Sequence, residues 1–145
     1  MMKKFLFAAL AVFLLLQPEE SKAQVSAGIY QQNLNTYLAI GTDPDEKMFG
    51  ELRLGAGDEL DLEGTFGYNF IQKQEVNFYS GAHLGVANLT TDFSEAYLGV
   101  PLGLLVKPFS AAPNLGFLLE ASPLVGFDSG DGYLRAGIGL KYTFR

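Results

Sequence analysis

The chain contains a single histidine, His83, which is the first side chain to consider as a catalytic group. Histidine activates a serine hydroxyl for nucleophilic attack when the two side chains lie within hydrogen-bond reach. Ser80 stands three residues before His83, in a segment where apolar and polar residues alternate. Side chains an odd number of positions apart point to opposite faces of a strand, so Ser80 and His83 cannot form a nucleophile and base pair. The simpler prediction is that His83 is hydrogen-bonded to a nearby carboxylate.

Carboxylates offer a second kind of chemistry, because Glu51, Asp61 and Glu63 could act as a general acid and base. Such a couple needs a substrate cavity beside it. A transition-metal site is not expected, since the chain has no cysteine and only one histidine. Neither a Gly-x-Ser-x-Gly motif nor a phosphate-binding loop occurs, and the two glycines at 55 and 57 read as a hairpin turn. We therefore predict no catalytic residue, no cofactor and no metal.

The elements that position these residues are strands, because apolar residues recur at every second position along most of the chain. In the last segment Leu134, Ala136, Ile138, Leu140, Tyr142 and Phe144 alternate with polar residues, cations and glycines. Eight such segments are predicted: Val25–Gln32, Thr36–Thr42, Met48–Ala56, Leu60–Gln72, Val76–Leu89, Ala96–Phe109, Leu115–Phe127 and Gly132–Arg145. The short connections between them predict antiparallel neighbours, since a parallel crossover needs a dozen residues or more.

The first 23 residues are predicted to be a cleaved secretory signal peptide. Lys3 and Lys4 precede an apolar run from Phe5 to Leu16, and small residues precede a cut ahead of Gln24. This run is shorter than the 17 to 25 or so residues that cross a bilayer as a helix. The mature domain, residues 24–145, then carries seven basic and fourteen acidic side chains, a net charge of −7. Nucleic acid is not expected as a partner, because phosphate binding needs a basic surface.

Two architectures place an apolar face beside a charged one: a soluble barrel or sandwich with an apolar core, and a membrane barrel with its apolar face outward. The non-apolar face is rich in glycine, with Gly67, Gly81, Gly85, Gly99, Gly103, Gly116, Gly126, Gly137 and Gly139. Glycine weakens a solvated strand surface, but a narrow eight-stranded lumen needs very small residues beside bulky ones. The sequence therefore predicts an all-β fold, an eight-stranded antiparallel up-and-down transmembrane β-barrel.

The same alternation places a set of charged residues in the lumen: Glu51, Arg53, Asp61, Glu63, Glu120, Arg135 and Lys141. Buried charges are costly unless they are paired, so we expect a compensating network. Glu120 is expected one strand from Arg135 or Lys141, and Arg53 one strand from Asp61 or Glu63. The alternative is that these charges form a solvated face.

A girdle of outward-facing aromatic residues is predicted near one end of the barrel. With both termini in the periplasm, the periplasmic end would carry Tyr68, Phe70, Phe78, Phe117, Tyr142 and Phe144. Acidic residues gather in the opposite loops, where they are either simply solvated or bind divalent cations that bridge lipopolysaccharide. Pro101 and Pro123 fall within predicted strands, where each marks a bulge or a break in the pairing.

The mature chain resembles the small eight-stranded outer-membrane β-barrel proteins, the class that includes the barrel of outer membrane protein A. The resemblance rests on the signal peptide, the eight alternating strands and the closing stretch from Ala136 to Phe144. The stretch from Tyr97 to Pro108 is also similar to a strand of proteins described as an outer membrane protein beta-barrel domain. The resemblance implies a Gram-negative outer-membrane location, contact with lipid and lipopolysaccharide, and recognition of the C-terminal strand, through Phe144, by the assembly machinery.

The function predicted from these observations is that of a non-enzymatic integral outer-membrane barrel with a structural or surface-interaction role in the cell envelope. A soluble secreted calyx-type barrel, which binds a small apolar ligand, is the first alternative. An enzyme that modifies the acyl chains of lipid A is the second, because some small outer-membrane barrels do this with a histidine and a serine.

Overall fold

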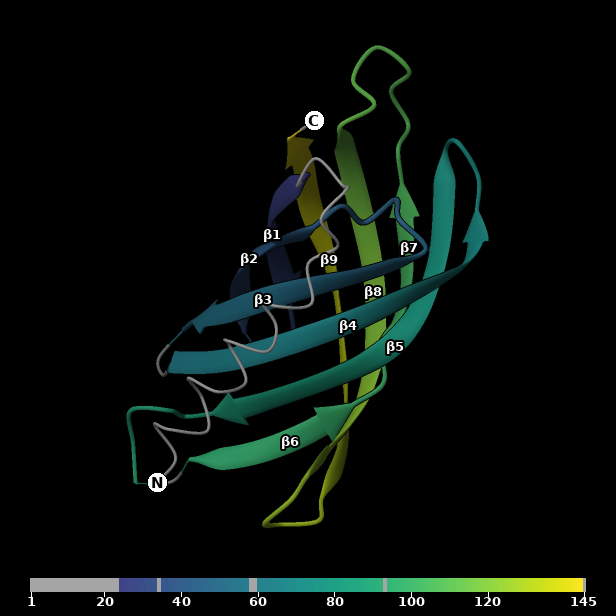
Figure 1. Ribbon diagram of the computed structural model, residues 1–145. Coiled ribbons are helices and arrows are strands. Elements are labelled where there is room, and N and C mark those ends of the chain that lie inside the picture. The colour runs from purple at the N-terminus through teal and green to yellow at the C-terminus, as the bar shows by residue number, and fades with distance from the viewer. Residues whose placement is uncertain (1–23, 34, 58–59, 93, 145) are drawn as a thin grey trace.

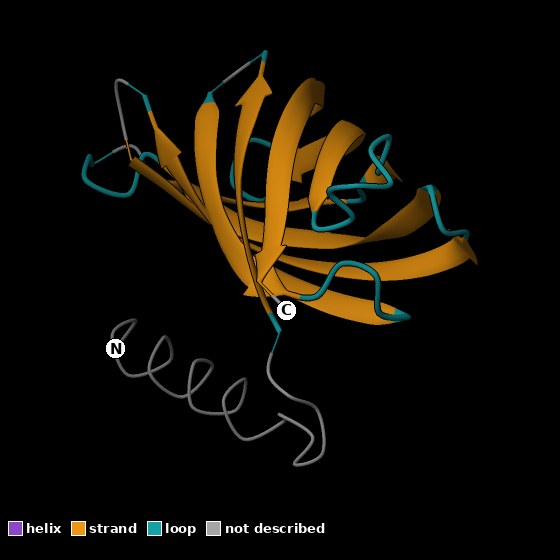
Figure 2. Ribbon diagram, turned by 90° about the horizontal axis from the view of Figure 1, so that it is seen from above, coloured by secondary structure: helices purple, strands orange, loops and turns teal. Residues whose placement is uncertain are grey.

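The computed structural model describes residues 24–33, 35–57, 60–92 and 94–144, and the predicted signal peptide lies outside these residues. The strands are β1 (Val25–Gln32), β2 (Thr36–Thr42), β3 (Met48–Ala56), β4 (Leu60–Gln72), β5 (Val76–Ala87), β6 (Glu95–Gly99), β7 (Leu102–Val106), β8 (Leu115–Gly126) and β9 (Gly132–Phe144). They make up the sheet in Figures 1 and 2. Within these described ranges, no helix is long and apolar enough to cross a membrane.

The sheet closes on itself, because each strand has an antiparallel neighbour on both sides. Neighbours in sequence pair as hairpins, with the exception of β6 and β7, which both pair with β5 and β8. The strand β1 pairs with β9 from Val25 opposite Phe144 to Gln32 opposite Gly137. Figure 1 shows β1 and β9 side by side although they begin and end the domain. With β6 and β7 counted as the two halves of one wall strand, the fold is a closed eight-stranded barrel. The predicted all-β barrel fold is confirmed.

The sixth predicted strand, Ala96–Phe109, is divided into β6 and β7 at Val100 and Pro101. The register stays the same across the break: Gly99 faces His83 and Leu124, and Leu102 faces Ser80 and Ala121. No residue is inserted, so Pro101 interrupts the hydrogen bonds without forming a bulge, because proline has no N–H to donate. Pro123 lies inside the continuous strand β8, opposite Leu134 of β9.

A true bulge occurs in β4, where the register against β5 shifts between Asn69 and Ile71. Phe70 and Ile71 both point outward as a result, and these residues are 48% and 43% exposed. The alternation therefore reverses beyond the bulge, and the side chain of Gln72 turns toward the mouth of the barrel, where it donates to the carbonyl of Asp45. The strand period alone did not reveal this shift.

The interior is polar and the exterior is apolar, which is the reverse of a soluble protein. Arg53, Arg135, Glu63 and His83 are among the most completely buried side chains. The exposed side chains include Ile40, Leu84, Leu119, Leu134 and Ile138, each exposed by more than half. The apolar face of the strands thus points away from the barrel axis.

Glycines make room for rings that lie flat across neighbouring strands inside the barrel. Five rings each face a glycine directly across a strand pair: Tyr30 with Gly139, Tyr37 with Gly55, Phe49 with Gly67, Tyr79 with Gly103, and Tyr97 with Gly85. A methyl group on Gly85 would lie 2.5 Å from Tyr97 Cζ, and one on Gly139 would lie 2.7 Å from Tyr30 Cδ1. The bulky and small residues therefore alternate from strand to strand, as a narrow lumen requires.

Candidate functional site: a buried ion network in the lumen

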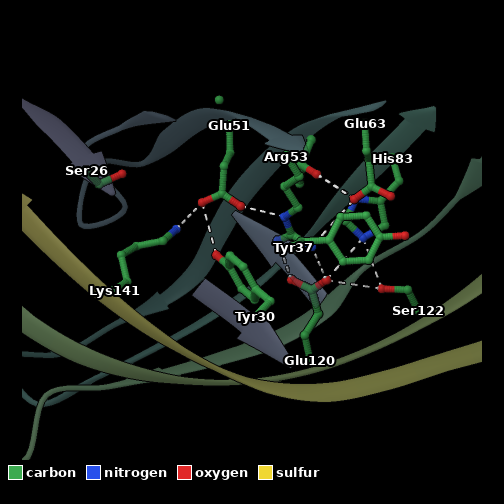
Figure 3. A network of polar contacts seen from close by, with 12 residues as sticks. Ser26, Tyr30, Tyr37, Glu51, Arg53, Glu63, His83, Glu120, Ser122 and Lys141 are labelled. Carbon is green, nitrogen blue, oxygen red and sulfur yellow. Dashed lines mark hydrogen bonds and ion pairs between the residues drawn. The ribbon is translucent and has the colours of Figure 1, made fainter. Parts of the chain in front are cut away.

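Six of the seven charged residues expected in the lumen are at most 4% exposed: Glu51, Arg53, Glu63, Glu120, Arg135 and Lys141. They come from β3, β4, β8 and β9, and Figure 3 shows Glu51, Arg53, Glu63, Glu120 and Lys141 turned toward one another. Three carboxylates and three bases balance in charge, and each of the six has an oppositely charged partner. Asp61, the seventh, is only half-buried, near the end of the barrel opposite the termini.

Arg53 is at the centre of the network. Its Nη1 and Nη2 donate to the two carboxylate oxygens of Glu120 at 2.7 and 2.8 Å, and its Nε donates to Glu51 Oε1 at 2.5 Å. The guanidinium also lies 4.2 Å from the centre of the Tyr30 ring. Arg53 belongs to β3 and Glu120 to β8, so this two-point contact joins strands that are not neighbours in the sheet. A bidentate arginine and carboxylate pair is both strong and specific in geometry.

Two further ion pairs complete the charge balance. Arg135 Nη1 lies 2.7 Å from Glu63 Oε2, and Lys141 pairs with Glu51. Glu120 lies one strand from Arg135 and Lys141, as expected, because β8 pairs with β9, but the register places it opposite Gly137. Glu120 instead reaches across the lumen to Arg53, whereas the expected contact from Arg53 to Glu63 is present at 3.5 Å.

Four tyrosine hydroxyls donate to the carboxylates, and sequence reasoning did not identify them. Each acid receives one: Glu51 from Tyr30 at 3.0 Å, Glu63 from Tyr97 at 2.5 Å, Asp61 from Tyr37 at 3.3 Å, and Glu120 from Tyr79. These are the four tyrosines that lie opposite a glycine. The signal was present in the sequence, since Tyr30, Tyr37, Tyr79 and Tyr97 share the strand parity of the charged face, but pairing each with its acid requires the register.

His83 lies between two carboxylates and two hydroxyls and has no exposed surface. Its Nδ1 is 3.0 Å from Glu63 Oε1 and 2.7 Å from Thr65 Oγ1. Its Nε2 is 3.0 Å from Ser122 Oγ and 3.2 Å from Glu120 Oε1. Ser80, which was considered as a partner, lies on the outward-facing parity of the same strand. The carboxylate contact expected for His83 is thus present on both ring nitrogens.

Ser122, His83 and Glu63 have the spacing of a nucleophile, a base and an orienting acid. This similarity to a catalytic triad was not visible in the sequence, because Ser122 is 39 residues from His83. Ser122 is 0% exposed. Glu120 Oε1 lies 3.4 Å from the Ser122 hydroxyl and also faces Nε2 of His83. A nucleophile needs space for a substrate beside it. The buried serine instead satisfies the polar atoms around it.

The aromatic residues predicted as a girdle all point outward and lie toward the end that holds both termini. Tyr68, Phe70, Phe78, Phe117, Tyr142 and Phe144 are exposed by 37 to 57%. Phe70 and Phe78 pack on one another with ring centres 5.2 Å apart, and Tyr142 and Phe144 with centres 5.0 Å apart. Among the described loop residues at the opposite end, the ionisable side chains are acids, such as Asp92, Asp128 and Asp131. Asp58 and Glu59 lie outside the described residues.

Comparison with solved structures identifies the same architecture elsewhere. The N-terminal β-barrel domain of Pseudomonas aeruginosa OprF aligns with a TM-score of 0.59 at 16% identity, over 84% of this chain and 96% of that one. Neisserial surface protein A aligns with a TM-score of 0.57 at 13% identity, over 84% of this chain and 94% of that one. The fold is that of a small outer-membrane β-barrel.

A third outer-membrane barrel, Ail of Yersinia pestis, aligns with a TM-score of 0.50 at 19% identity, over 85% of this chain and 100% of that one. No protein-family model matches the sequence of this barrel, and no curated protein matches it either. The interpretation as a membrane barrel therefore rests on the fold and on the polarity of its two faces. The closed sheet satisfies its own backbone hydrogen bonds, and the apolar side chains face outward, as a lipid environment requires.

Proposed function

We propose that this protein is an integral barrel of the bacterial outer membrane without enzymatic activity, and that its role in the cell envelope is structural or an interaction at the cell surface. The observation that carries the proposal is the inverted polarity of the barrel. Leu84, Leu119 and Ile138 are each exposed by more than half, whereas Arg53 and Glu63 are completely buried. In water this arrangement exposes a continuous apolar surface, but in a bilayer the surface is covered by hydrocarbon.

The partners proposed for the barrel follow from its two ends and its belt. Lipid acyl chains contact the belt, and the aromatic girdle lies at the interface on the side of the termini. At the other end the acidic loops would meet the anionic headgroups of lipopolysaccharide, with divalent cations between them or with solvation alone. The outer-membrane assembly machinery would recognise β9, in which Phe144 is the last outward-facing aromatic residue.

Membrane fractionation followed by gel electrophoresis tests the location. We expect the mature protein in the outer-membrane fraction, extractable only with detergent, and a folded form that migrates differently from the boiled form. Recovery in a soluble fraction without detergent would refute the assignment and favour the calyx alternative. The structure favours the membrane form, since a calyx for an apolar ligand needs an apolar interior, whereas Arg53, Arg135 and Glu63 fill this one.

A serine-directed fluorophosphonate probe tests the absence of enzymatic activity, because Ser122, His83 and Glu63 have the spacing of a triad. We expect no adduct on the folded barrel, since the Ser122 side chain is completely buried. The Ser122→Ala variant identifies any background labelling at other serines. An adduct on Ser122 that is lost in His83→Ala would contradict the non-enzymatic proposal and favour the acyl-modifying alternative.

A further inference from the structure

We propose that the turn between β2 and β3, Asp43 to Lys47, is a latched lid that controls the access of water and small ions to the lumen from the end that holds the termini. This inference goes beyond the proposed function, since it concerns how one mouth of the barrel is closed. Asp43 and Pro44 of this turn are buried although they connect two strands at the rim. Connections at a barrel rim normally run over the surface, so a buried turn indicates that it folds inward.

The contact between Asp45 and Lys107 spans the mouth. Lys107 follows β7, and β2 and β7 are four strands apart in either direction around the eight-stranded wall. Lys107 Nζ lies 2.5 Å from Asp45 Oδ1, and Asn77 Nδ2 of β5 donates to the same oxygen at 2.6 Å. In Figure 1 the turn extends from the side of β2 and β3 toward β7. One carboxylate therefore fastens the turn to the opposite wall.

Side-chain amides hold the backbone of the turn. Asn69 Nδ2 donates to the carbonyls of Pro44 and Glu46, both at 2.7 Å, and Asn69 itself is 0% exposed. Gln72 Nε2, which the β4 bulge turns toward the mouth, donates to the carbonyl of Asp45 at 2.7 Å. Backbone N–H groups bind the carbonyls of Asp43 and Lys47 at the two ends of the turn. Asn69 and Gln72 bind the carbonyls between them through their side chains. Such contacts can break without unfolding a strand, which suits a moving part.

Two hollows of very different size border the turn. One, of about 510 Å³, is lined by residues that include Asp43, Asp45, Asn77 and Lys107. The other, an inner cavity of about 10 Å³, is lined by Pro44, Asp45, Lys107, Lys141 and Thr143 among others. The inner cavity is about the volume that one water molecule needs. Lys141 pairs with Glu51, so the turn, together with Pro113 and Asn114 of the connection between β7 and β8, lies beside the first ion pair of the network.

The contact that closes this latch is partly screened by solvent and partly reinforced by an amide. The side chains of Asp45 and Lys107 are 23% and 12% exposed, so water screens their attraction in part. The carboxylate also accepts from Asn77, and hydrogen bonds to a charged group are stronger than those between neutral groups. Asp45→Ala removes both contacts at once, and Asp45 lies outside the strands.

A cysteine placed behind the lid reports its opening, because the natural chain has no cysteine. Thr143 lines the inner cavity and is 3% exposed, so Thr143→Cys gives a buried thiol of similar size. The purified barrel in detergent is treated with a small anionic methanethiosulfonate, and the rate of modification is followed by mass spectrometry. We expect slow labelling in this parent and at least about a tenfold increase when Asp45→Ala is added.

Glu46→Ala is the matched control, since it removes a carboxylate from the same turn, and this side chain is exposed. Asn69 contacts only the backbone carbonyl of Glu46, so the labelling rate should stay within about twofold of the parent. If Asp45→Ala gives no folded band on a gel, Lys107→Met breaks the same ion pair from the other side. Equal rates in the parent and both latch variants, or a parent that reacts as fast as a free thiol, would overturn the lid. Either result leaves the membrane assignment intact.

Discussion

Arg53 is the residue on which the lumenal ion pairs converge, and its removal gives the sharpest test of the network. Arg53→Met keeps most of the side-chain volume but leaves Glu51 and Glu120 without their shared cation. Breaking a buried ion pair from one side costs about 3 to 5 kcal/mol, because the remaining charge is buried without compensation. We expect a loss of that size in the free energy of unfolding, measured by denaturant titration in detergent micelles.

Two controls make this prediction specific. Lys73→Met removes one positive charge from the exposed turn between β4 and β5 and should leave stability nearly unchanged. The double variant Arg53→Met/Glu120→Gln removes a charge of each sign, so it should recover part of the loss. A loss in Lys73→Met as large as that in Arg53→Met would show that net charge, rather than the buried network, determines stability.

The pairing of a glycine with a tyrosine ring predicts a second effect at the residue scale. Gly103→Ala places a methyl group against the ring of Tyr79, whose hydroxyl donates to Glu120. Overpacking of this kind costs about 1 to 3 kcal/mol in the free energy of unfolding. Gly64→Ala is the control, because its new methyl group faces outward and meets only the Leu84 carbonyl at 3.8 Å. Equal stability of the two variants would contradict the requirement for glycine in the lumen.

At the scale of the strand, Pro101 and Pro123 lie along the same seam, the line where β6 and β7 pair with β8, and neither has an N–H to donate there. Val100 N donates to the Pro123 carbonyl at 3.1 Å, and in an antiparallel pair the return bond would come from the N–H of residue 123, which proline lacks. Pro123 points outward, so Pro123→Val supplies the N–H without filling the lumen. We expect a slowly exchanging amide hydrogen at residue 123 in this variant, at a position that has no amide hydrogen in the parent.

The gain in stability from that hydrogen bond can be isolated by comparison with Pro108→Val. Pro108 is exposed and follows β7, and both substitutions release the restriction that proline places on the unfolded chain. The difference in free energy of unfolding between the two variants therefore reports the ladder bond, and we expect about 1 kcal/mol in favour of Pro123→Val. If the two variants are equally stable, the seam is not limited by the missing donor.

The elements also show which features of the fold were readable in the sequence. The first four strands have the predicted bounds, and the predicted parity places Glu51, Arg53 and Glu63 inside, because period two depends only on neighbouring residues. The partners of these residues depend on the register of nonadjacent strands, so the contact from Arg53 to Glu120 could not be read. The same holds for Ser122 beside His83. The β4 bulge and the inward fold of the β2–β3 turn depend on contacts between distant residues, which no local pattern encodes.

At the scale of the whole molecule, the strand β9 carries a direct test of where the hydrocarbon lies. Ile138 is in the middle of β9 and Leu134 is near the end opposite the termini, and both point outward, exposed by 61% and 59%. An arginine on the lipid face costs about 2 to 4 kcal/mol at the midplane of a bilayer and about 0 to 1 kcal/mol near its surface. We therefore expect Ile138→Arg to destabilise the barrel in lipid vesicles far more than Leu134→Arg.

Comparing Ile138→Arg with Leu134→Arg distinguishes a bilayer from water, because the two positions differ in their depth along the barrel but hardly at all in their exposure. In water, each arginine would extend into solvent, and both variants would unfold at nearly the same denaturant concentration as the parent. In a bilayer, the cost of an arginine depends on its depth, and the two variants differ only if the midplane of the bilayer lies at the level of Ile138. Equal and small effects of both substitutions in vesicles would mean that lipid does not surround the strands, and the charged lumen would then need another explanation.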